Sequence, residues 1–170
     1  MDHQIFLAIN GLAEQSNFLD QIGIFFAENF LYFFLILVAL LWLKTEWRSN
    51  VYAALLSAAV SRGVIVEMIK RMVARPRPFE ILQVNQLIEE DIKRSFPSGH
   101  AVIYFSLAFA FYGTRLFWPF IFLASLGSLA RIFVGVHYPL DVLAGLLTAA
   151  VTVFLVRRFF ETKKASATEA

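Results

Sequence analysis

Long apolar runs are the feature that most constrains how this chain can fold. Hydrophobic residues make up 59% of the 170 residues and charged residues 16%, whereas a soluble domain is about half apolar and about a quarter charged. The apolar residues gather in runs at positions 22–43, 51–73, 99–112, 116–133 and 139–156. A transmembrane helix needs about 20 consecutive, mostly apolar residues. The sequence therefore predicts an all-α, polytopic transmembrane helical bundle of five spans.

The remaining segments are too short for a second domain. Residues 5–13 are apolar but are interrupted by Asn10 and Gly11, so they predict an interfacial helix, or a sixth span if the segment inserts. We expect a single membrane domain over residues 1–170, surrounded by membrane lipids. The chain has no cysteine, which excludes disulfides and thiol chemistry. Its net charge of +2 is too small to suggest a nucleic-acid partner.

The second apolar run carries charges within it. Arg62, Glu67, Lys70 and Arg71 all fall between residues 51 and 73. Glu67 precedes Lys70 by three residues and Arg71 by four, a spacing that suits pairing within one helix. We therefore expect Glu67 to hold a basic side chain, and not to act as a catalyst.

A polar loop of about twenty residues follows this run, from position 74 to 95. It begins Arg75-Pro-Arg77-Pro, where the prolines end the helix and favour extended backbone. Further along, apolar side chains recur at helical spacing among polar ones, at Ile81, Val84, Ile88 and Ile92. This pattern predicts a short amphipathic helix at the membrane surface.

Helix direction brings distant polar segments together. Because consecutive spans alternate in direction, residues 70–77, 98–100 and 131–141 all reach the same membrane face. The two faces carry equal numbers of basic residues. Once Lys70, Arg77 and Arg131 are assigned to a site, the opposite face is the more basic, and the positive-inside rule places it and the C-terminus in the cytoplasm. The polar cluster is then expected to face outward.

The cluster has the composition of an anion site. Charged groups at membrane depth are costly and are functional by default, although Lys and Arg near helix ends also extend to the interface without further role. Arg131 follows a long apolar run, and with Lys70 and Arg77 it gives three cations that no excess of carboxylates matches. Guanidinium and ammonium groups bind phosphate. Ser98 and Gly99, at the start of the third span, would add backbone N–H groups at a helix N-terminus.

Two histidines share this face of the membrane. His137 and Asp141 are four residues apart, so the carboxylate can fix the imidazole tautomer and leave the other nitrogen free. His100 belongs to a different helix. Beside a phosphate held by cations, two histidines with different neighbours suggest one nucleophile and one general acid. His3, alone near the N-terminus, has no such context.

These residues resemble the type 2 phosphatidic acid phosphatase (PAP2) superfamily, which also includes vanadium haloperoxidases. The motif core spans residues 70–141 and comprises Lys70 with Arg77-Pro78, Pro97-Ser98-Gly99-His100, and Arg131 with His137 and Asp141. The order and the internal spacing of all three motifs agree. One position departs from the pattern, because the third motif usually begins Ser-Arg and here Ala130 precedes Arg131. A supporting hydrogen bond is lost there, but no charge that grips phosphate.

The resemblance implies a hydrolase that cleaves phosphate esters or anhydrides through a phosphohistidine, without a metal or another cofactor. It implies that His137 is the nucleophile, that Asp141 orients it and that His100 protonates the leaving group. The phosphoryl oxygens would be held by a set of polar residues: Lys70, Arg77, Ser98, Gly99 and Arg131.

The substrate implied by the resemblance is a lipid phosphate or diphosphate. The chain's small size and its opening residues resemble the short bacterial undecaprenyl-diphosphate phosphatases, which would place it in the bacterial inner membrane with a role in cell wall (peptidoglycan) biogenesis. An outward-facing site agrees with that substrate. A phosphatidylglycerophosphate or phosphatidate phosphatase would use the same residues, because the motifs recognise the phosphate and not the tail.

Two other classes of function share some of these features. A haem- or metal-binding membrane protein could use His100 and His137 as ligands, but Lys70, Arg77 and Arg131 would repel a metal ion. A phospholipid-binding or transport protein could share the basic pocket. It would not need a histidine and an aspartate in a nucleophile–orienter arrangement.

Overall fold

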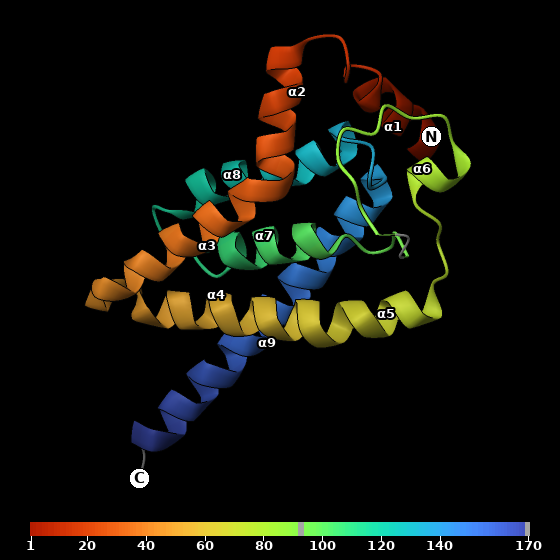
Figure 1. Ribbon diagram of the computed structural model, residues 1–170. Helices are drawn as coiled ribbons and strands as arrows, with labels where there is room; N and C mark the ends of the chain where they lie inside the picture. Colours follow the sequence, from red (N-terminus) through yellow and green to blue (C-terminus); the bar gives the residue numbers. More distant parts are fainter. Residues whose placement is uncertain (92–93, 169–170) are drawn as a thin grey trace.

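The protein is a bundle of helices. A computed structural model describes residues 1–91 and 94–168, with side chains described as far as residue 161, and every regular element among them is helical (Figure 1). The α-helices are α1 (Asp2–Asn10), α2 (Asn17–Ile24), α3 (Phe30–Leu40), α4 (Arg48–Val60), α5 (Val66–Met72), α6 (Pro78–Ile81), α7 (Gly99–Phe109), α8 (Phe117–Phe133) and α9 (Pro139–Thr168). Two π-helical segments, η1 (Phe25–Asn29) and η4 (Ser61–Ile65), and two 3₁₀ segments, η2 (Leu41–Leu43) and η3 (Thr45–Trp47), continue them. The predicted all-α class is confirmed.

The apolar runs form the long elements of the bundle. Three continuous helical stretches are long and apolar enough to cross a membrane, at Asn17–Leu43, Thr45–Met72 and Pro139–Glu161. The other two runs form shorter apolar helices, α7 with 11 residues and α8 with 17. Helix α1 has only nine residues, too few for a span. It packs against α8 and α9, so the N-terminal segment does not add a sixth span.

Helix α7 lies at the centre of the bundle. It packs against α3, α4, α8 and α9, and Figure 1 shows it enclosed by these helices. Most of its side chains are buried, among them Tyr104 and Leu107, which are fully inaccessible. A helix surrounded in this way does not have to match the full thickness of a bilayer, because its ends are covered by other parts of the protein.

The close approach of α9 to α7 depends on a glycine. A Cβ atom on Gly145 would lie 2.9 Å from the carbonyl oxygen of Ser98 and 2.9 Å from the Cβ of Ala101. Without a side chain at this position, α9 can lie against the first turn of α7. The packing thereby fixes the start of α7 relative to the start of α9.

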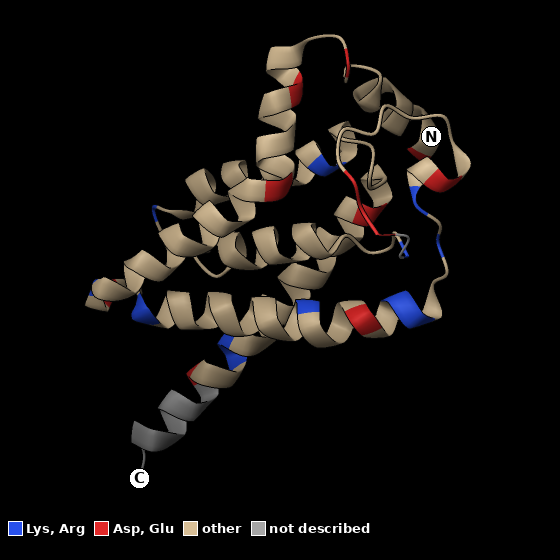
Figure 2. Ribbon diagram, viewed as in Figure 1, with Lys and Arg blue, Asp and Glu red and all other residues tan. Residues whose placement is uncertain are grey.

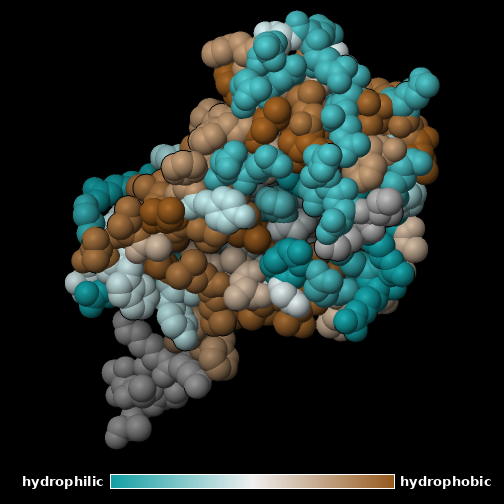
Figure 3. All heavy atoms as spheres, viewed as in Figure 1, coloured by the Kyte–Doolittle hydropathy of each residue, from teal (hydrophilic) through white to brown (hydrophobic). Residues whose placement is uncertain are grey.

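The outer surfaces of the bundle are apolar. Large side chains such as Phe33, Trp118 and Phe154 are mostly exposed. Figure 3 shows hydrophobic atoms over α3 and hydrophilic atoms over the end of α5 and the loop between α6 and α7. Apolar exposure on this scale is what a lipid-facing surface requires. The chain is a multi-pass membrane protein.

The prediction of an amphipathic surface helix in the long loop is wrong. Only α6 forms, and from residue 82 to the start of α7 the described backbone is irregular. Val84 and Ile88 pack inward against two small apolar clusters of the bundle instead of lying along the membrane surface. Ile92 lies outside the described residues.

The irregular backbone of this loop obtains its hydrogen bonds from the bundle. The Asn10 side chain accepts from the N–H of Asn85 at 2.9 Å and donates to its carbonyl oxygen at 2.8 Å. The N–H of Leu87 donates to the carbonyl oxygen of Val134 at 3.3 Å. Buried backbone groups need partners, and here tertiary contacts supply what a helix would otherwise provide.

Candidate active site

The three polar segments that alternating spans bring to one face do meet in the structure. Figure 2 shows charged residues gathered around the end of α5, α6, the loop and the start of α9, with few charges along α3 and α7. A pocket of about 110 Å³ opens among them. It is lined by Arg62, Lys70, Arg77, Glu90, Gly99, His100, Ile103 and His137.

His137 and Asp141 lie side by side and are both buried. His137 precedes α9, and Asp141 lies in the first turn of that helix. The two atoms Nδ1 of His137 and Oδ2 of Asp141 are 3.4 Å apart, at the outer limit of a hydrogen bond. The same carboxylate accepts from the N–H of Tyr138 at 2.9 Å, so its position is fixed by the backbone. With Nδ1 facing the carboxylate, Nε2 is the ring nitrogen left for the pocket.

Burial decides the protonation state of His137. It lowers the pKa of the imidazole to about 4, and the neighbouring cations Arg131 and Arg77 act in the same direction, against the effect of Asp141. A group with a pKa this far below 7 is neutral at physiological pH. A neutral imidazole has a lone pair to offer as a nucleophile.

Two further side chains, both from the segment between α5 and α7, bind the Asp141 carboxylate. Ser95 donates its hydroxyl to Oδ2, and Arg75 donates to Oδ1 at 2.7 Å. Arg75 also pairs with Asp2 of α1 and lies over the ring of Tyr138, 4.1 Å from its centroid. The Asp141 carboxylate is therefore held by four groups, of which sequence reasoning anticipated only the histidine.

The buried arginines Arg77 and Arg131 share one carboxylate. Arg77 is 3% exposed and Arg131 2%. Nη2 of Arg77 lies 3.4 Å from Oε1 of Glu90, and Nη2 of Arg131 pairs with Oε2. Burial raises the pKa of Glu90, but the effects of Arg131 and Arg77 are together larger and leave it below its ordinary value, so Glu90 is ionised. The loop thus supplies one carboxylate for two of the three cations, a partner that the sequence did not identify.

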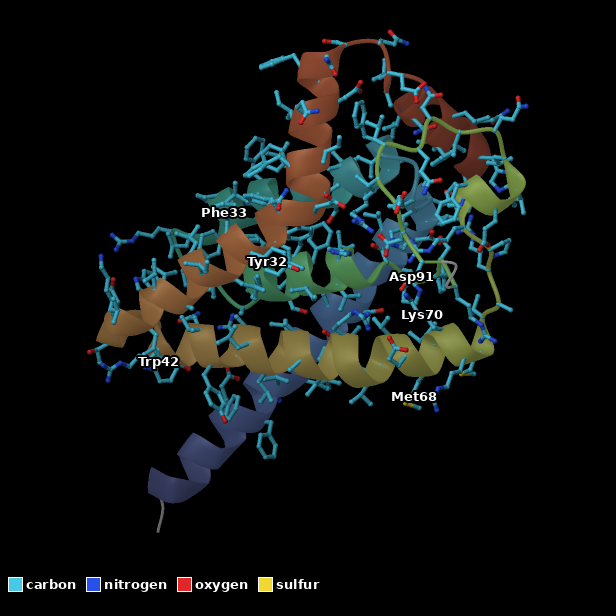
Figure 4. The ribbon with its side chains drawn as sticks, in the orientation of Figure 1. Tyr32, Phe33, Trp42, Met68, Lys70 and Asp91 are labelled. Atoms are coloured by element: carbon cyan, nitrogen blue, oxygen red, sulfur yellow. The ribbon has the colours of Figure 1, made fainter. Side chains whose placement is uncertain are left out.

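Lys70 extends from the last turn of α5 toward the pocket. In Figure 4 it lies on the side of α5 that faces the loop carrying Asp91, whereas Met68 lies on the opposite side. The ammonium group is half-buried and lines the pocket together with Arg77 and His100. The structure thus brings these three predicted residues together.

The segment Ser98-Gly99-His100 starts helix α7 as expected. The hydroxyl and N–H of Ser98, however, bond within the protein and do not face the pocket. Ser98 is the N-cap, and its hydroxyl accepts from the N–H of Ala101 at 3.4 Å. The N–H of Ser98 donates to the carbonyl oxygen of Asp141 at 3.0 Å. Gly99 and His100 line the pocket, whereas Ser98 is fully buried behind them. Arg131 likewise lies behind the lining, beside Glu90.

Glu67 holds a basic side chain as expected, but the partner is not one that the spacing suggested. Glu67 pairs with Arg62 at 2.6 Å, five residues before it, and not with Lys70 or Arg71. The π-helical segment η4 begins at Ser61 and ends at Ile65. A π-helix places residues five apart over one another, which explains the change of partner.

Residues 51–165 match the sequence model of the PAP2 superfamily. This stretch is more than half of the chain and includes all three motifs. This chain belongs to the PAP2 superfamily. The position where it departs from the family motif, Ala130, is buried in an apolar cluster with Ala27, Val134 and Val136, where a hydroxyl is not needed for packing.

The PAP2 relatives of this chain include phosphatases of lipid substrates. This chain is 34% identical over 165 residues to undecaprenyl-diphosphatase BcrC of Bacillus subtilis. The alignment covers 94% of this chain and 84% of that protein. Its fold resembles the crystal structure of Aquifex aeolicus LpxE, with a TM-score of 0.78, 27% identity and coverage of 92% and 94%. A Bacillus subtilis PAP2-type phosphatidylglycerolphosphate phosphatase shares the fold at a TM-score of 0.66 and 22% identity, over 94% of this chain and 86% of that one. The chain is accordingly similar to lipid phosphatases of the PAP2 superfamily.

Proposed function

We propose that this protein hydrolyses the terminal phosphate of undecaprenyl diphosphate through a phosphohistidine at His137, without a metal ion. The observation that carries the proposal is the buried, neutral His137, whose Nδ1 faces Asp141 while its ring lines a pocket shared with Lys70, Arg77 and His100. The proposed nucleophile, proton donor and phosphate-binding cations would thus line one pocket, with the orienting carboxylate of Asp141 buried beside the nucleophile.

The first half of the reaction transfers the phosphoryl group to the protein. Nε2 of His137 attacks the terminal phosphorus, and the bond from phosphorus to the bridging oxygen breaks. His100, on the facing helix α7, gives its proton to that oxygen, so undecaprenyl phosphate leaves. Asp141 stabilises the positive charge that develops on the His137 ring.

The second half restores the histidine. A water molecule attacks the phosphorus of the phosphohistidine while His100, now neutral, takes the proton from that water. The bond between Nε2 and phosphorus breaks, inorganic phosphate leaves, and His100 is again protonated. The net reaction consumes one water molecule for each phosphate released.

The phosphate is held by groups at different depths. Lys70, Arg77 and the backbone of Gly99 line the pocket and would contact the phosphoryl oxygens directly. Arg131 is paired to Glu90 behind the lining, so it reaches the substrate only if the phosphate takes the place of that carboxylate. Ser98 contributes by capping α7. These cations occupy the position in which a catalytic metal would otherwise neutralise the phosphate charge.

The choice of undecaprenyl diphosphate rests on the relative that is named for that activity and covers nearly the whole chain. An outward-facing site in the bacterial inner membrane would meet this carrier on the side where its diphosphate form is released. The second candidate is a glycerophospholipid phosphatase acting on phosphatidylglycerophosphate or phosphatidate, since the same residues would serve.

Phosphate release by the purified protein tests the proposal. Undecaprenyl diphosphate, phosphatidylglycerophosphate and phosphatidate are compared at equal mole fraction in detergent micelles, with and without a chelator. We expect the highest kcat/KM for undecaprenyl diphosphate and no effect of the chelator. A loss that Mg²⁺ restores would contradict the metal-free mechanism, and a preference for either glycerophospholipid would overturn the substrate.

The same assay distinguishes a phosphatase from a lipid-binding or transport protein. The matched control is His137→Ala, which leaves the cationic pocket in place but removes the nucleophile. If the wild-type protein binds the lipid diphosphate but releases no more phosphate than this variant, the protein is not a phosphatase.

A further inference from the structure

Arg62 is a charged residue within the second span, and it belongs to none of the three sequence motifs. It lies in the π-helical segment η4, between two apolar stretches of the second span. π-Helical segments are frequent at functional sites, and an arginine at membrane depth is costly unless it has a role. Its side chain is 40% exposed and pairs with Glu67, whose side chain is 48% exposed, so packing does not account for it.

Arg62 lies against the start of helix α7. A Cβ atom on Gly99 would be 2.6 Å from Nε of Arg62, so the guanidinium crosses the backbone immediately before His100. Because Gly99 has no side chain, the guanidinium can approach the first turn of α7. Arg62 thus stands beside the residue that we assign as the proton donor to the leaving group.

A second, larger pocket begins at this point. It has a volume of about 600 Å³ and shares Arg62 and Lys70 with the catalytic pocket. Its charged lining consists of five basic residues, Arg62, Lys70, Arg71, Arg75 and Arg94, against two acidic ones, Glu67 and Glu80. The two pockets are therefore neighbours, joined by two cations, and the larger one has an excess of positive charge.

We propose that the larger pocket binds the inner phosphate of a lipid diphosphate, with Arg62 as the residue that selects diphosphates over monophosphates. The inference rests on the proposed function. When the terminal phosphate fills the catalytic pocket, the leaving group of a diphosphate is itself an anion. It extends past Arg62 and Lys70, where a guanidinium can donate two parallel hydrogen bonds to its oxygens. A monophosphate ester has no group to place there.

The test uses two substrates with the same tail, farnesyl diphosphate and farnesyl monophosphate. The measured quantity is the ratio of their kcat/KM values in the wild-type protein and in Arg62→Met. Charge-assisted hydrogen bonds contribute about 1.5–3 kcal/mol, so we expect the ratio to fall roughly 10- to 100-fold in the variant. Arg62→Lys, which keeps the charge, should restore part of the ratio.

Glu67→Gln distinguishes a role of Arg62 in substrate binding from a role in its ion pair with Glu67. This variant breaks the Arg62–Glu67 pair but leaves the guanidinium in place, so we expect a diphosphate-to-monophosphate ratio equal to or above the wild-type value. If Glu67→Gln lowers the ratio as much as Arg62→Met does, the ion pair is what matters and the subsite is overturned. An unchanged ratio in Arg62→Met overturns it as well.

A measurement on the wild-type protein keeps the proposal testable if the variants do not fold. Inorganic pyrophosphate, which can fill both pockets, should compete with the lipid substrate at least tenfold more tightly than inorganic phosphate does. Equal inhibition would contradict the second subsite. If the wild-type protein releases phosphate from neither farnesyl substrate nor from undecaprenyl diphosphate, the proposed function fails, which is a different outcome from the failure of the subsite.

Discussion

The Asp141 carboxylate has more hydrogen-bond partners than the sequence motif predicts. Its carboxylate is approached by His137, by the backbone of Tyr138, by Ser95 and by Arg75. Arg75 precedes α6, Ser95 lies at the end of the loop before α7, and His137 and Tyr138 immediately precede α9. An orienting carboxylate held from several sides cannot rotate away from the imidazole, so the tautomer of His137 stays fixed.

Arg75 should therefore be a positioning residue for His137, the proposed nucleophile. Arg75→Gln removes the contact to Asp141 and the cation–π contact to Tyr138, and we expect kcat to fall roughly 10- to 100-fold, as for loss of one charged hydrogen bond. The KM for a lipid monophosphate should change much less. The control is Asp2→Asn, which removes the outer partner of Arg75 but not its contact to Asp141. Equal losses of kcat in the two variants would show that Arg75 only anchors α1.

Glu90 pairs with Arg77 and Arg131, so we expect it to compete with phosphate for their guanidinium groups. Glu90→Gln keeps the shape of the side chain but removes its charge, so an anion should enter more easily. We expect inhibition by orthovanadate, a phosphate analogue, to tighten several-fold in this variant. Glu89→Gln, at the exposed neighbouring position, is the control. Weaker inhibition in Glu90→Gln would instead mean that the carboxylate holds the two arginines in place for the phosphate.

The residues that the sequence identified differ in kind from those that it missed. Lys70, His100 and His137 belong to motifs with fixed spacing, and alternating spans were enough to bring them together. Glu90 lies in a run of three acidic residues, and only the path of the loop decides which of them faces the arginines. The role of Ser95 depends on the same path. Periodicity carries no information about an irregular segment of this kind.

At the scale of the elements, the contact between α7 and α9 holds the two halves of the site in register. The N–H of Ser98 donates to the carbonyl oxygen of Asp141 across this contact, and Gly145 permits it. The apolar spacing of the loop misled the prediction here, since Val84 and Ile88 pack into the bundle from irregular backbone. Tertiary contacts with α1 and α8 decided the conformation of the loop.

A methyl group at position 145 should disturb the site from a distance. In Gly145→Ala the new Cβ would lie 2.9 Å from the carbonyl oxygen of Ser98, which is backbone and can give way only if α7 shifts. Overpacking costs about 1–3 kcal/mol, so we expect a lower midpoint of thermal unfolding in detergent and reduced phosphate release. Gly63→Ala is the control, because nothing lies within 4 Å of its Cβ position. Unchanged stability and activity in Gly145→Ala would show that the helices are free to separate.

At the scale of the whole molecule, the helices formed by the five apolar runs place the two ends of the chain at opposite ends of the bundle. Figure 1 shows the N-terminus beside the loop and the site, and the C-terminus at the far end of α9. Composition and the number of apolar runs were sufficient to predict this arrangement. The orientation in the membrane depends on the positive-inside rule and on the assignment of three basic residues to the site.

Single cysteines test the orientation, because the chain has none of its own. Gln86 is exposed in the loop, and Thr45 is exposed at the opposite end of the bundle. In intact cells, a membrane-impermeant maleimide should label Gln86→Cys and leave Thr45→Cys unlabelled until the membrane is opened. The reverse pattern would place the site in the cytoplasm.

The most direct test of the central claim is the capture of the phosphoryl group on His137. The purified protein is mixed with undecaprenyl diphosphate carrying ³²P in its terminal phosphate, quenched in alkaline denaturant within a single turnover, and digested to peptides. The account predicts a label that is stable to alkali, lost in acid and located on His137, and no label in His137→Ala. Single-turnover phosphate release without label on the protein, or a label on another residue, would contradict it.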